Sequence, residues 1–445
     1  MANHETSSLD RRSFLGKSLA AGAASALTIL KPELVRGAGK ERLRAGLVGC
    51  GGRGTGAATD LLTADPNVEL VAMGDIFEDK LQASLKNLCD PKFLSDESPK
   101  RVADFTGKPL GDLVESITKR VKVDPDHCFV GFDAYRKVLA SDIDFVLLCT
   151  PPGHRPAHFE AAVEARKHIF TEKPISTDAV GARRFLAATE KARSLKLTVV
   201  AGTQRRSAKE TIETVQKIHD GAIGDVVALG ANYLSGPVLH VDHRDPSWGD
   251  MEWQHRGWYS FVWICGDQMV EQHIHTIDLC NWVAGAHPIS VVASGGAAWR
   301  PREELYGNIY DHLNADFTYA NGVHMLSACR QYPKGGYRKV WATIVGSKGR
   351  SDGSDMGTKG LDPQVQEHVR LVASIRGDGP YSNEGVQVAE STLTCIMARE
   401  SAYSGLEITW DQVMASQQDL YPKTFDYKQA MDVPPLPVPG KYTFV

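Results

Sequence analysis

Short apolar runs alternate with amphipathic, helix-like stretches in the first half of the chain. The apolar runs have the length of buried parallel strands and end in glycine or polar residues. They cover Leu43 to Val48, Val68 to Met73, Phe145 to Cys149, His168 to Thr171 and Leu197 to Ala201. Helical patterns lie between them, at Thr55 to Thr63, Asp79 to Leu88, Phe159 to Ala165 and Ala179 to Leu195. This alternation predicts an α/β fold built on a doubly wound parallel sheet.

The pattern changes after Gln204. Apolar and polar residues then alternate in longer strands, predicted at Val226 to Leu234, Ile289 to Ser294, Asn314 to Tyr319, His324 to Arg330 and Val340 to Val345. Such alternation predicts a second α/β domain with a large open, mainly antiparallel sheet, covered on one face. A single helix is predicted to interrupt these strands, from Asp267 to Trp282. Polar residues 90–126 are predicted to be an irregular insertion with a helix near Leu110 to Val121.

These patterns divide the chain into four parts. Residues 1–40 are a terminal signal and linker, and residues 41–203 are the doubly wound domain. Residues 204–420 form the C-terminal domain, and the Pro-rich residues 421–445 are expected to lie extended over the surface.

The terminal segment has the order of a twin-arginine export signal. Arg11 and Arg12 precede Phe14 and Leu15, and an Ala-rich apolar run follows from Ser18 to Leu30. Export to the periplasm is therefore expected. The run is too short, and too rich in alanine and glycine, for a transmembrane helix, so no stable membrane insertion is expected once the signal is removed.

The net charge and the cysteine spacing exclude several classes of partner and metal site. The 445 residues carry a formal net charge of −4, which gives no electrostatic reason to bind nucleic acid or an anionic membrane surface. None of the eight cysteines belongs to a Cys-x-x-Cys pair, so neither a structural zinc site nor a redox dithiol is expected.

A glycine-rich turn joins the first predicted strand to the first helix. It contains Gly49, Cys50, Gly51, Gly52, Arg53 and Gly54, the G-x-G-x-x-G fingerprint of a Rossmann dinucleotide site. The glycines allow a tight turn, close approach of a pyrophosphate and close helix packing, and the helix N-terminus offers free N–H groups. Asp75 ends the second strand about twenty residues further on, where a carboxylate accepts ribose hydroxyls and repels a 2′-phosphate. NAD is therefore favoured over NADP.

The tripeptide Glu172-Lys173-Pro174 follows the fourth predicted strand. Ligands of parallel sheets bind outside the carboxyl ends of the strands, where a lysine can orient a hydroxyl or exchange its proton. From spacing alone, a surface lysine before a proline turn is an equally good interpretation.

A dense polar cluster lies on the predicted helix Asp267 to Trp282. There Glu271, His275 and Asp278 stand at i, i+4 and i+7 and share one face. A histidine can accept a hydroxyl proton while a carboxylate holds its ring, although a buried structural histidine is the alternative. His273 points about 200° away, so it is not expected to share a metal with His275, and no metal site is predicted.

Aromatic and hydrogen-bonding side chains gather just upstream of that helix, at His255, Arg256, Trp258 and Tyr259. Ring faces can cover the C–H surface of a sugar while polar groups bind its hydroxyls. Together with Asp278 they are candidate substrate residues, and a packed loop is the equally weighted alternative.

These elements, in this order, resemble the Gfo/Idh/MocA oxidoreductase family, from Leu43 to about Ser404. The resemblance implies that Lys173 and His275 are catalytic and that Glu271 assists. The family usually has aspartate in place of Glu271 and often glycine in place of His273. The resemblance also implies a nicotinamide pocket lined by Thr150, Pro151, His154, Glu172 and Gln204.

The resemblance implies an NAD-dependent oxidoreductase that acts on a ring CH–OH of a sugar or cyclitol, in a homodimer or homotetramer. Free NAD is not expected in the periplasm, so an exported enzyme would keep and recycle a tightly bound cofactor. Two alternatives stay open. One is a redox-neutral NAD-dependent glycoside hydrolase, similar to the α-N-acetylgalactosaminidases of this superfamily, and the other is a non-catalytic sugar-binding protein.

Overall fold

The computed structural model describes residue 37 and residues 39–445. The proposed export signal, with Arg11 and Arg12, lies outside the described residues. Within the described part, no helix is both long and apolar enough to cross a membrane.

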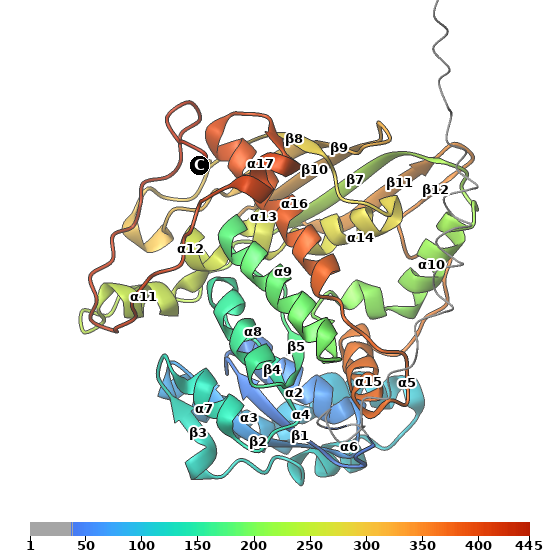
Figure 1. Cartoon of the computed structure of the whole chain (residues 1–445), viewed down its shortest axis with the longest axis vertical. Coiled ribbons are helices and arrows are strands. Elements are labelled where there is room, and N and C mark those ends of the chain that lie inside the picture. Colours follow the sequence, from blue (N-terminus) through green and yellow to red (C-terminus); the bar gives the residue numbers. More distant parts are fainter. Residues whose placement is uncertain (1–36, 38) are drawn as a thin grey trace, which may run out of the picture. The chain divides into compact units, whose positions relative to one another are not determined.

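The first sheet confirms the doubly wound prediction (Figure 1). Its strands are β1 (Leu43–Val48), β2 (Val68–Asp75), β3 (Cys128–Val130), β4 (Phe145–Leu148), β5 (His168–Thr171) and β6 (Val199–Ala201). They lie in the order β3-β2-β1-β4-β5-β6, and all neighbours are parallel. The chain reverses direction across the sheet between β1 and β4, so a crevice opens there at the carboxyl ends of the strands.

Helices connect these strands: α2 (Gly52–Ala64), α3 (Glu78–Leu88), α4 (Pro91–Ser95), α5 (Ser98–Thr106), α6 (Leu110–Thr118), α7 (Ala134–Ala140), α8 (Arg155–Glu164) and α9 (Ala179–Ser194). The helix predicted near Leu110 to Val121 in the insertion is confirmed as α6, but the irregular stretch predicted before it is wrong, because it folds into α4 and α5. Asp90 caps α4 and accepts a hydrogen bond from the Lys92 N–H, and Pro91 occupies the first turn. Both are helix-start signals in the sequence.

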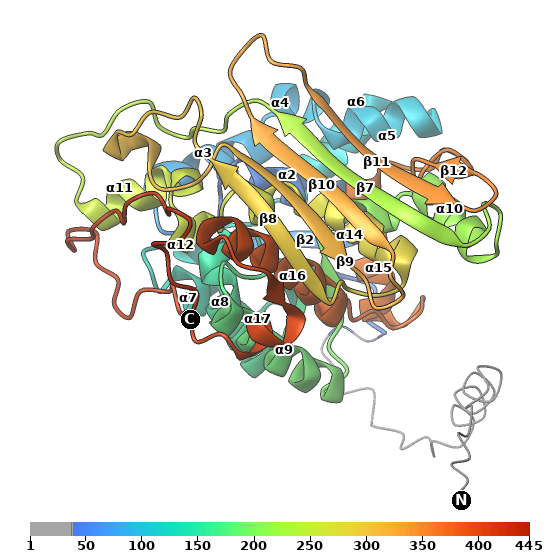
Figure 2. The same ribbon diagram turned by 90° about the horizontal axis from the view of Figure 1, so that it is seen from above.

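The second sheet contains β7 (Val226–Ser235), β8 (Ser290–Gly296), β9 (His312–Thr318), β10 (His324–Gln331), β11 (Lys339–Gly346), β12 (Arg350–Ser351) and β13 (Ile408–Thr409). Their order is β12-β11-β7-β10-β9-β8-β13, and Figure 2 shows the longer strands side by side. Only β7 and β10 pair in parallel among these strands of the described chain. The prediction of a mainly antiparallel sheet is confirmed.

One face of this sheet is covered by helices. The helices after β6 are α10 (Lys209–His219), α11 (Asp250–Arg256), α12 (Val262–Cys265), α13 (Gln268–Glu271), α14 (Ile274–Ala284), α15 (Pro363–Arg376), α16 (Gly385–Ser404) and α17 (Trp410–Ala415). The long helix α16 is buried on nearly all sides, because it packs against β8 and α14 and also against α9 of the first domain. Helix α16 therefore packs against both domains and lies between their sheets.

The single helix predicted from Asp267 to Trp282 is broken in two, and that prediction is wrong. Helix α13 ends at Glu271, and α14 starts at Ile274. The Glu271 carbonyl oxygen accepts a hydrogen bond from Lys173 Nζ at 2.6 Å, and the His273 ring bonds Ser327 of β10 at 2.7 Å. Lys173 thus takes the Glu271 carbonyl that a continuous helix would have paired with the N–H of His275, and the His273 side chain gains a partner on the second sheet.

Candidate active site

The glycine-rich turn has the backbone geometry of a dinucleotide site. Gly49 adopts φ 92°, which favours glycine, and a Cβ on Gly54 would lie 1.8 Å from the Gly49 carbonyl oxygen. A Cβ on Gly51 or Gly52 would meet no atom within 4 Å, so the turn presents open backbone at the start of α2. A pyrophosphate fits these N–H groups and the positive end of the α2 dipole.

Asp75 lies beside this turn at the end of β2. Its carboxylate accepts hydrogen bonds from the Cys50 N–H at 2.6 Å and the Phe77 N–H at 2.8 Å. Burial raises the pKa of Asp75, and the two backbone hydrogen bonds lower it in part. The carboxylate also lines the cavity in front of the turn, where its free lone pairs can accept ribose hydroxyls.

A cavity of about 920 Å³ runs from this turn to the second domain. Its adenosine end, as Asp75 defines it, includes Ile76, Phe77 and Lys80. Its other end, which we name the catalytic end, is lined by Lys173, Tyr233, His240, Trp258, Glu271, Gln272 and His275. The cavity is thus open to both halves of a dinucleotide and to a second molecule.

Lys173 is held at the catalytic end by α13. Its Nζ donates to the Glu271 carbonyl oxygen at 2.6 Å and lies 3.0 Å from Glu271 Oε1. The lysine and glutamate side chains are only 11% and 13% exposed, so water screens this ion pair weakly. The ammonium therefore has a fixed position at the edge of the cavity.

Arg53 connects the glycine-rich turn to the segment after β5 that bears Lys173. Its Nε lies 2.8 Å from Glu172 Oε1 in an ion pair bent too far for a hydrogen bond, and its Nη2 donates to Asp60 at 2.9 Å. Glu172 Oε2 accepts the backbone N–H of Lys173 at 3.1 Å. The turn and the lysine are thereby joined through one buried carboxylate.

The His275 ring faces the same end of the cavity from α14. Within the described chain, no protein group makes a hydrogen bond to its ring nitrogens. Burial lowers the pKa of His275 far below its usual value, and the nearby cations Lys173, Arg205 and Arg53 lower it further. The ring is therefore neutral at pH 7 and can accept a proton.

The predicted site residues separate into groups. The turn residues Gly49 to Gly54, with Asp75, Thr150, Pro151, Glu172, Lys173 and Gln204, line the main cavity, and His154 lines a smaller one beside it. Glu271 and His275 meet at the catalytic end with Lys173. Trp258 lies there too, with its ring stacked on His240 at 5.1 Å.

Two other candidate substrate residues, Arg256 and His255, line the cavity at its adenosine end, and Tyr259 lies outside the cavity. The Arg256 guanidinium stacks on Phe77, 3.9 Å from the ring centre, which places it at the adenosine end. His255 is buried there against His154, with their Nε2 atoms 3.0 Å apart. Tyr259 is 1% exposed and bonds to Gln331, outside the lining of the cavity.

Asp278 is also outside the cavity, so its assignment to one face with Glu271 and His275 needs correction. Arg206 forms a bidentate ion pair with its carboxylate, at 2.9 and 3.1 Å, and Ser391 donates at 2.7 Å. The break between α13 and α14 removes the helical register that the prediction assumed.

Sequence reasoning missed Tyr233, His240 and Gln272 at the catalytic end, and Tyr421 and Phe425 at the other. The first three lie in a strand, a loop and a helix break, with no motif to distinguish them. A signal did exist for the last two, since aromatic residues are unexpected in a polar, Pro-rich tail.

Buried histidines predict instability in acid. Burial lowers the pKa of His158 and His273 to about 3, and that of His255 to about 4. Unfolded histidine titrates near pH ~6.5, so below that pH the unfolded chain binds more protons than the folded one. Each histidine should then cost about 1.4 kcal/mol of unfolding free energy per pH unit, down to its folded pKa. Guanidinium unfolding at stepped pH values tests this, and a flat or rising free energy below neutrality would contradict it.

The fold and the glycine-rich turn define an NAD-binding Rossmann domain. A model described as "Oxidoreductase family, NAD-binding Rossmann fold" matches residues 43–201, and one described as "GFO/IDH/MocA C-terminal domain" matches residues 212–351. The chain belongs to the Gfo/Idh/MocA family, which confirms the resemblance inferred from its motifs.

Similar proteins include an inositol 2-dehydrogenase of Rhizobium meliloti, 29% identical over 211 residues, or 47% of this chain and 57% of that protein. The chain spans 57–58% of the length of three curated relatives that it matches.

Solved structures share the fold. The WlbA dehydrogenase from Bordetella pertussis, in complex with NADH and UDP-GlcNAcA, aligns with a TM-score of 0.60 and 18% identity over 83% of this chain and 98% of that one. An aldose-aldose oxidoreductase from Caulobacter crescentus, complexed with glycerol, aligns with a TM-score of 0.58 and 14% identity over 83% and 99%.

Proposed function

We propose that this protein oxidises a ring CH–OH of a sugar or cyclitol with NAD. The observation that carries the proposal is the meeting of Lys173, Glu271 and His275 at one open end of a cavity whose other end holds the dinucleotide turn. The names of the similar proteins support a polyhydroxylated substrate, because they include an inositol dehydrogenase, an aldose–aldose oxidoreductase and a structure with a bound nucleotide sugar.

Two side chains act on one substrate hydroxyl in this proposal. The neutral His275 ring accepts the hydroxyl proton as general base. The Lys173 ammonium donates to the same oxygen and stabilises the charge that develops on it. Glu271 keeps the ammonium in place through the contacts at 2.6 and 3.0 Å. Bound NAD supplies the hydride acceptor.

The substrate ring is placed by the other side chains at this end. Trp258 and His240 form a stacked pair that offers a flat apolar surface to C–H groups, and Tyr233 and Gln272 offer hydroxyl and amide hydrogen bonds. We assign the choice of sugar or cyclitol to these residues.

The protein is further proposed to be exported with its cofactor bound, and to recycle that cofactor without release. It is also proposed to form a homodimer or homotetramer through the uncovered face of the second sheet. Val292 and Leu326 support this interface, because they flank Asp316 on neighbouring strands and are 57% and 63% exposed.

One experiment separates the open functions. The purified protein is examined for retained nicotinamide absorbance, then offered free sugars, cyclitols and aryl glycosides in deuterated water. Oxidation of a free sugar or cyclitol, with reduction of the bound nicotinamide, is expected. Aglycone release without net NADH, with solvent deuterium in the sugar, would replace the proposal with the redox-neutral glycoside hydrolase. Binding of sugars without either product would identify a non-catalytic binder.

A further inference from the structure

The C-terminal tail returns to the adenosine end of the dinucleotide site. The Tyr427 hydroxyl donates to the carbonyl oxygen of Ile76, the residue that follows Asp75. The Tyr427 ring packs on Phe132, with ring centres 4.6 Å apart, and lies 6.1 Å from Phe77. The tail thus bridges two turns of the first domain, and Tyr427 lies 351 positions after Ile76 in the chain.

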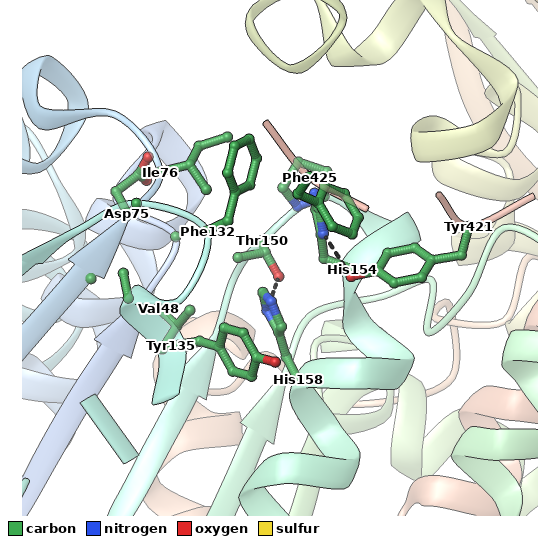
Figure 3. A pocket seen from close by; sticks show the side chains of 15 residues that line it. Val48, Asp75, Ile76, Phe132, Tyr135, Thr150, His154, His158, Tyr421 and Phe425 are labelled. Carbon is green, nitrogen blue, oxygen red and sulfur yellow. Dashed lines mark hydrogen bonds between the residues drawn. The ribbon is translucent and has the colours of Figure 1, made fainter. Parts of the chain in front are cut away.

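A second, smaller cavity of about 70 Å³ lies beneath this segment. Figure 3 shows Asp75, Ile76 and Phe132 on one side of it and Phe425 and Tyr421 on the other. Gly49, Asp75, Ile76, Thr150 and Pro151 line both this cavity and the main one, so the two adjoin. A ribose held by Asp75 carries its base into the neighbourhood of these rings, whose faces suit a purine.

A chain of hydrogen bonds anchors the start of the segment. His255 Nδ1 lies 2.6 Å from the Met251 carbonyl oxygen, which only accepts, so this nitrogen carries the proton. Burial lowers the pKa of both His255 and His154, so both rings are neutral. His255 Nε2 must then accept from His154 Nε2 at 3.0 Å, and His154 Nδ1 accepts from the Tyr421 hydroxyl at 3.3 Å. In this series of hydrogen bonds, each donor has one acceptor.

Helix α11 anchors the other end. The Met251 N–H donates to the Gln429 carbonyl oxygen at 3.2 Å, and the Met431 N–H donates to Asp250 at 3.1 Å. Gln254 Nε2 donates to the Met431 carbonyl oxygen at 2.8 Å. Residues 421–431 are therefore fixed across the site at both ends, with Phe425 and Tyr427 between the anchors.

We propose that residues 421–427 are part of the NAD site and that Phe425 and Tyr427 set the lifetime of the bound dinucleotide. The inference rests on the proposed use of NAD by this cavity. An adenosine end closed by this segment must open before the cofactor leaves, so loss of the Phe425 ring or of the Tyr427 hydrogen bond to Ile76 speeds release. This assigns to the tail the cofactor retention that an exported, self-recycling enzyme needs.

The test compares three variants of the full chain. Phe425→Ala removes a ring over the small cavity, Tyr427→Phe removes only the hydrogen bond to Ile76, and Val438→Ala is a control in the same tail, 47% exposed. NADH dissociation is followed by displacement with excess ADP-ribose. Release is expected to be about tenfold faster in Phe425→Ala, about fivefold faster in Tyr427→Phe and unchanged in the control.

Two further readouts separate a site role from a structural one. Affinity for ADP-ribose should fall in Phe425→Ala, while affinity for reduced nicotinamide mononucleotide, which lacks the adenosine, should not. If Phe425→Ala does not fold, the isosteric Tyr427→Phe decides the matter. Equal release from all three variants, with NADH bound by each, overturns the inference and leaves the proposed function intact. Failure of the unaltered protein to bind NADH overturns both.

Discussion

Replacing Lys173 with methionine is expected to lower kcat about a thousandfold while NAD still binds. Methionine keeps much of the length and apolar volume of the lysine stem but has no ammonium. The substrate oxygen then loses the donor that stabilises its developing charge. Glu271 also loses its counter-ion, with its carboxylate 13% exposed. Steady-state kinetics on the substrate identified from the panel, with NADH titration beside them, give the measurement.

The control for this variant is a second lysine–glutamate pair. Lys119 Nζ lies 2.6 Å from Glu115 on the protein surface, and neither residue lines the cavity. Lys119→Met should therefore leave kcat within about twofold of its normal value. A Lys173→Met enzyme that keeps a tenth or more of normal kcat would remove the lysine from the mechanism. Lost NADH binding would instead indicate a structural role.

Replacing Gly54 with alanine is expected to destroy NAD binding and to destabilise the fold by about 3 kcal/mol or more. The new Cβ would lie 1.8 Å from the Gly49 carbonyl oxygen and 3.3 Å from the Cys149 side chain. The Gly49 backbone has little room to move, since a Cβ on Gly49 would itself lie 2.7 Å from the backbone of Cys149 and Thr150. Chemical unfolding and NADH titration measure the two effects.

Two other glycines of the same region act as references. A Cβ on Gly56 meets only the Arg53 guanidinium at 3.5 Å, so Gly56→Ala should stabilise α2 by about 0.5–1 kcal/mol. Gly51→Ala meets nothing within 4 Å, so it should keep the stability of the protein yet weaken NADH binding by blocking the pyrophosphate. Equal stability and affinity in Gly54→Ala and Gly56→Ala would show that the turn does not hold a dinucleotide in the way described.

The features predicted well are those encoded in a few consecutive residues. Apolar runs located five of the six strands of the first sheet to within two residues, because a buried parallel strand needs little beyond its own side chains to be recognisable. Strand β3 (Cys128–Val130) was missed, because it is only three residues long and is not buried. The glycine-rich turn and Asp75 were predicted equally well, since a strand, a tight turn and a helix N-terminus each have a recognisable pattern within a few consecutive residues. Lys173 was found because it ends a strand at the edge where such sheets bind ligands.

The predictions that failed depended on partners distant in sequence. Asp278 was assigned to the face of Glu271 on the assumption of one straight helix, but Arg206 takes its carboxylate and Lys173 takes the carbonyl that would have continued the helix. Arg256, a candidate substrate residue, lines the cavity but is placed at its adenosine end by stacking on Phe77. No pattern in the sequence around Asp278 or around Arg256 predicts these contacts.

The sequence by itself therefore determined the class of fold, the dinucleotide turn, the preference for NAD and the lysine at the strand end. Tertiary structure alone decided that Asp278 pairs with Arg206 outside the cavity and that Arg256 packs on Phe77, and it placed the aromatic tail over the adenosine end. The physical reason is the separation along the sequence of the residues that interact. Backbone conformation and burial follow from neighbours along the chain, whereas an ion pair or a ring contact is settled by whichever segments the folded core brings within a few ångströms.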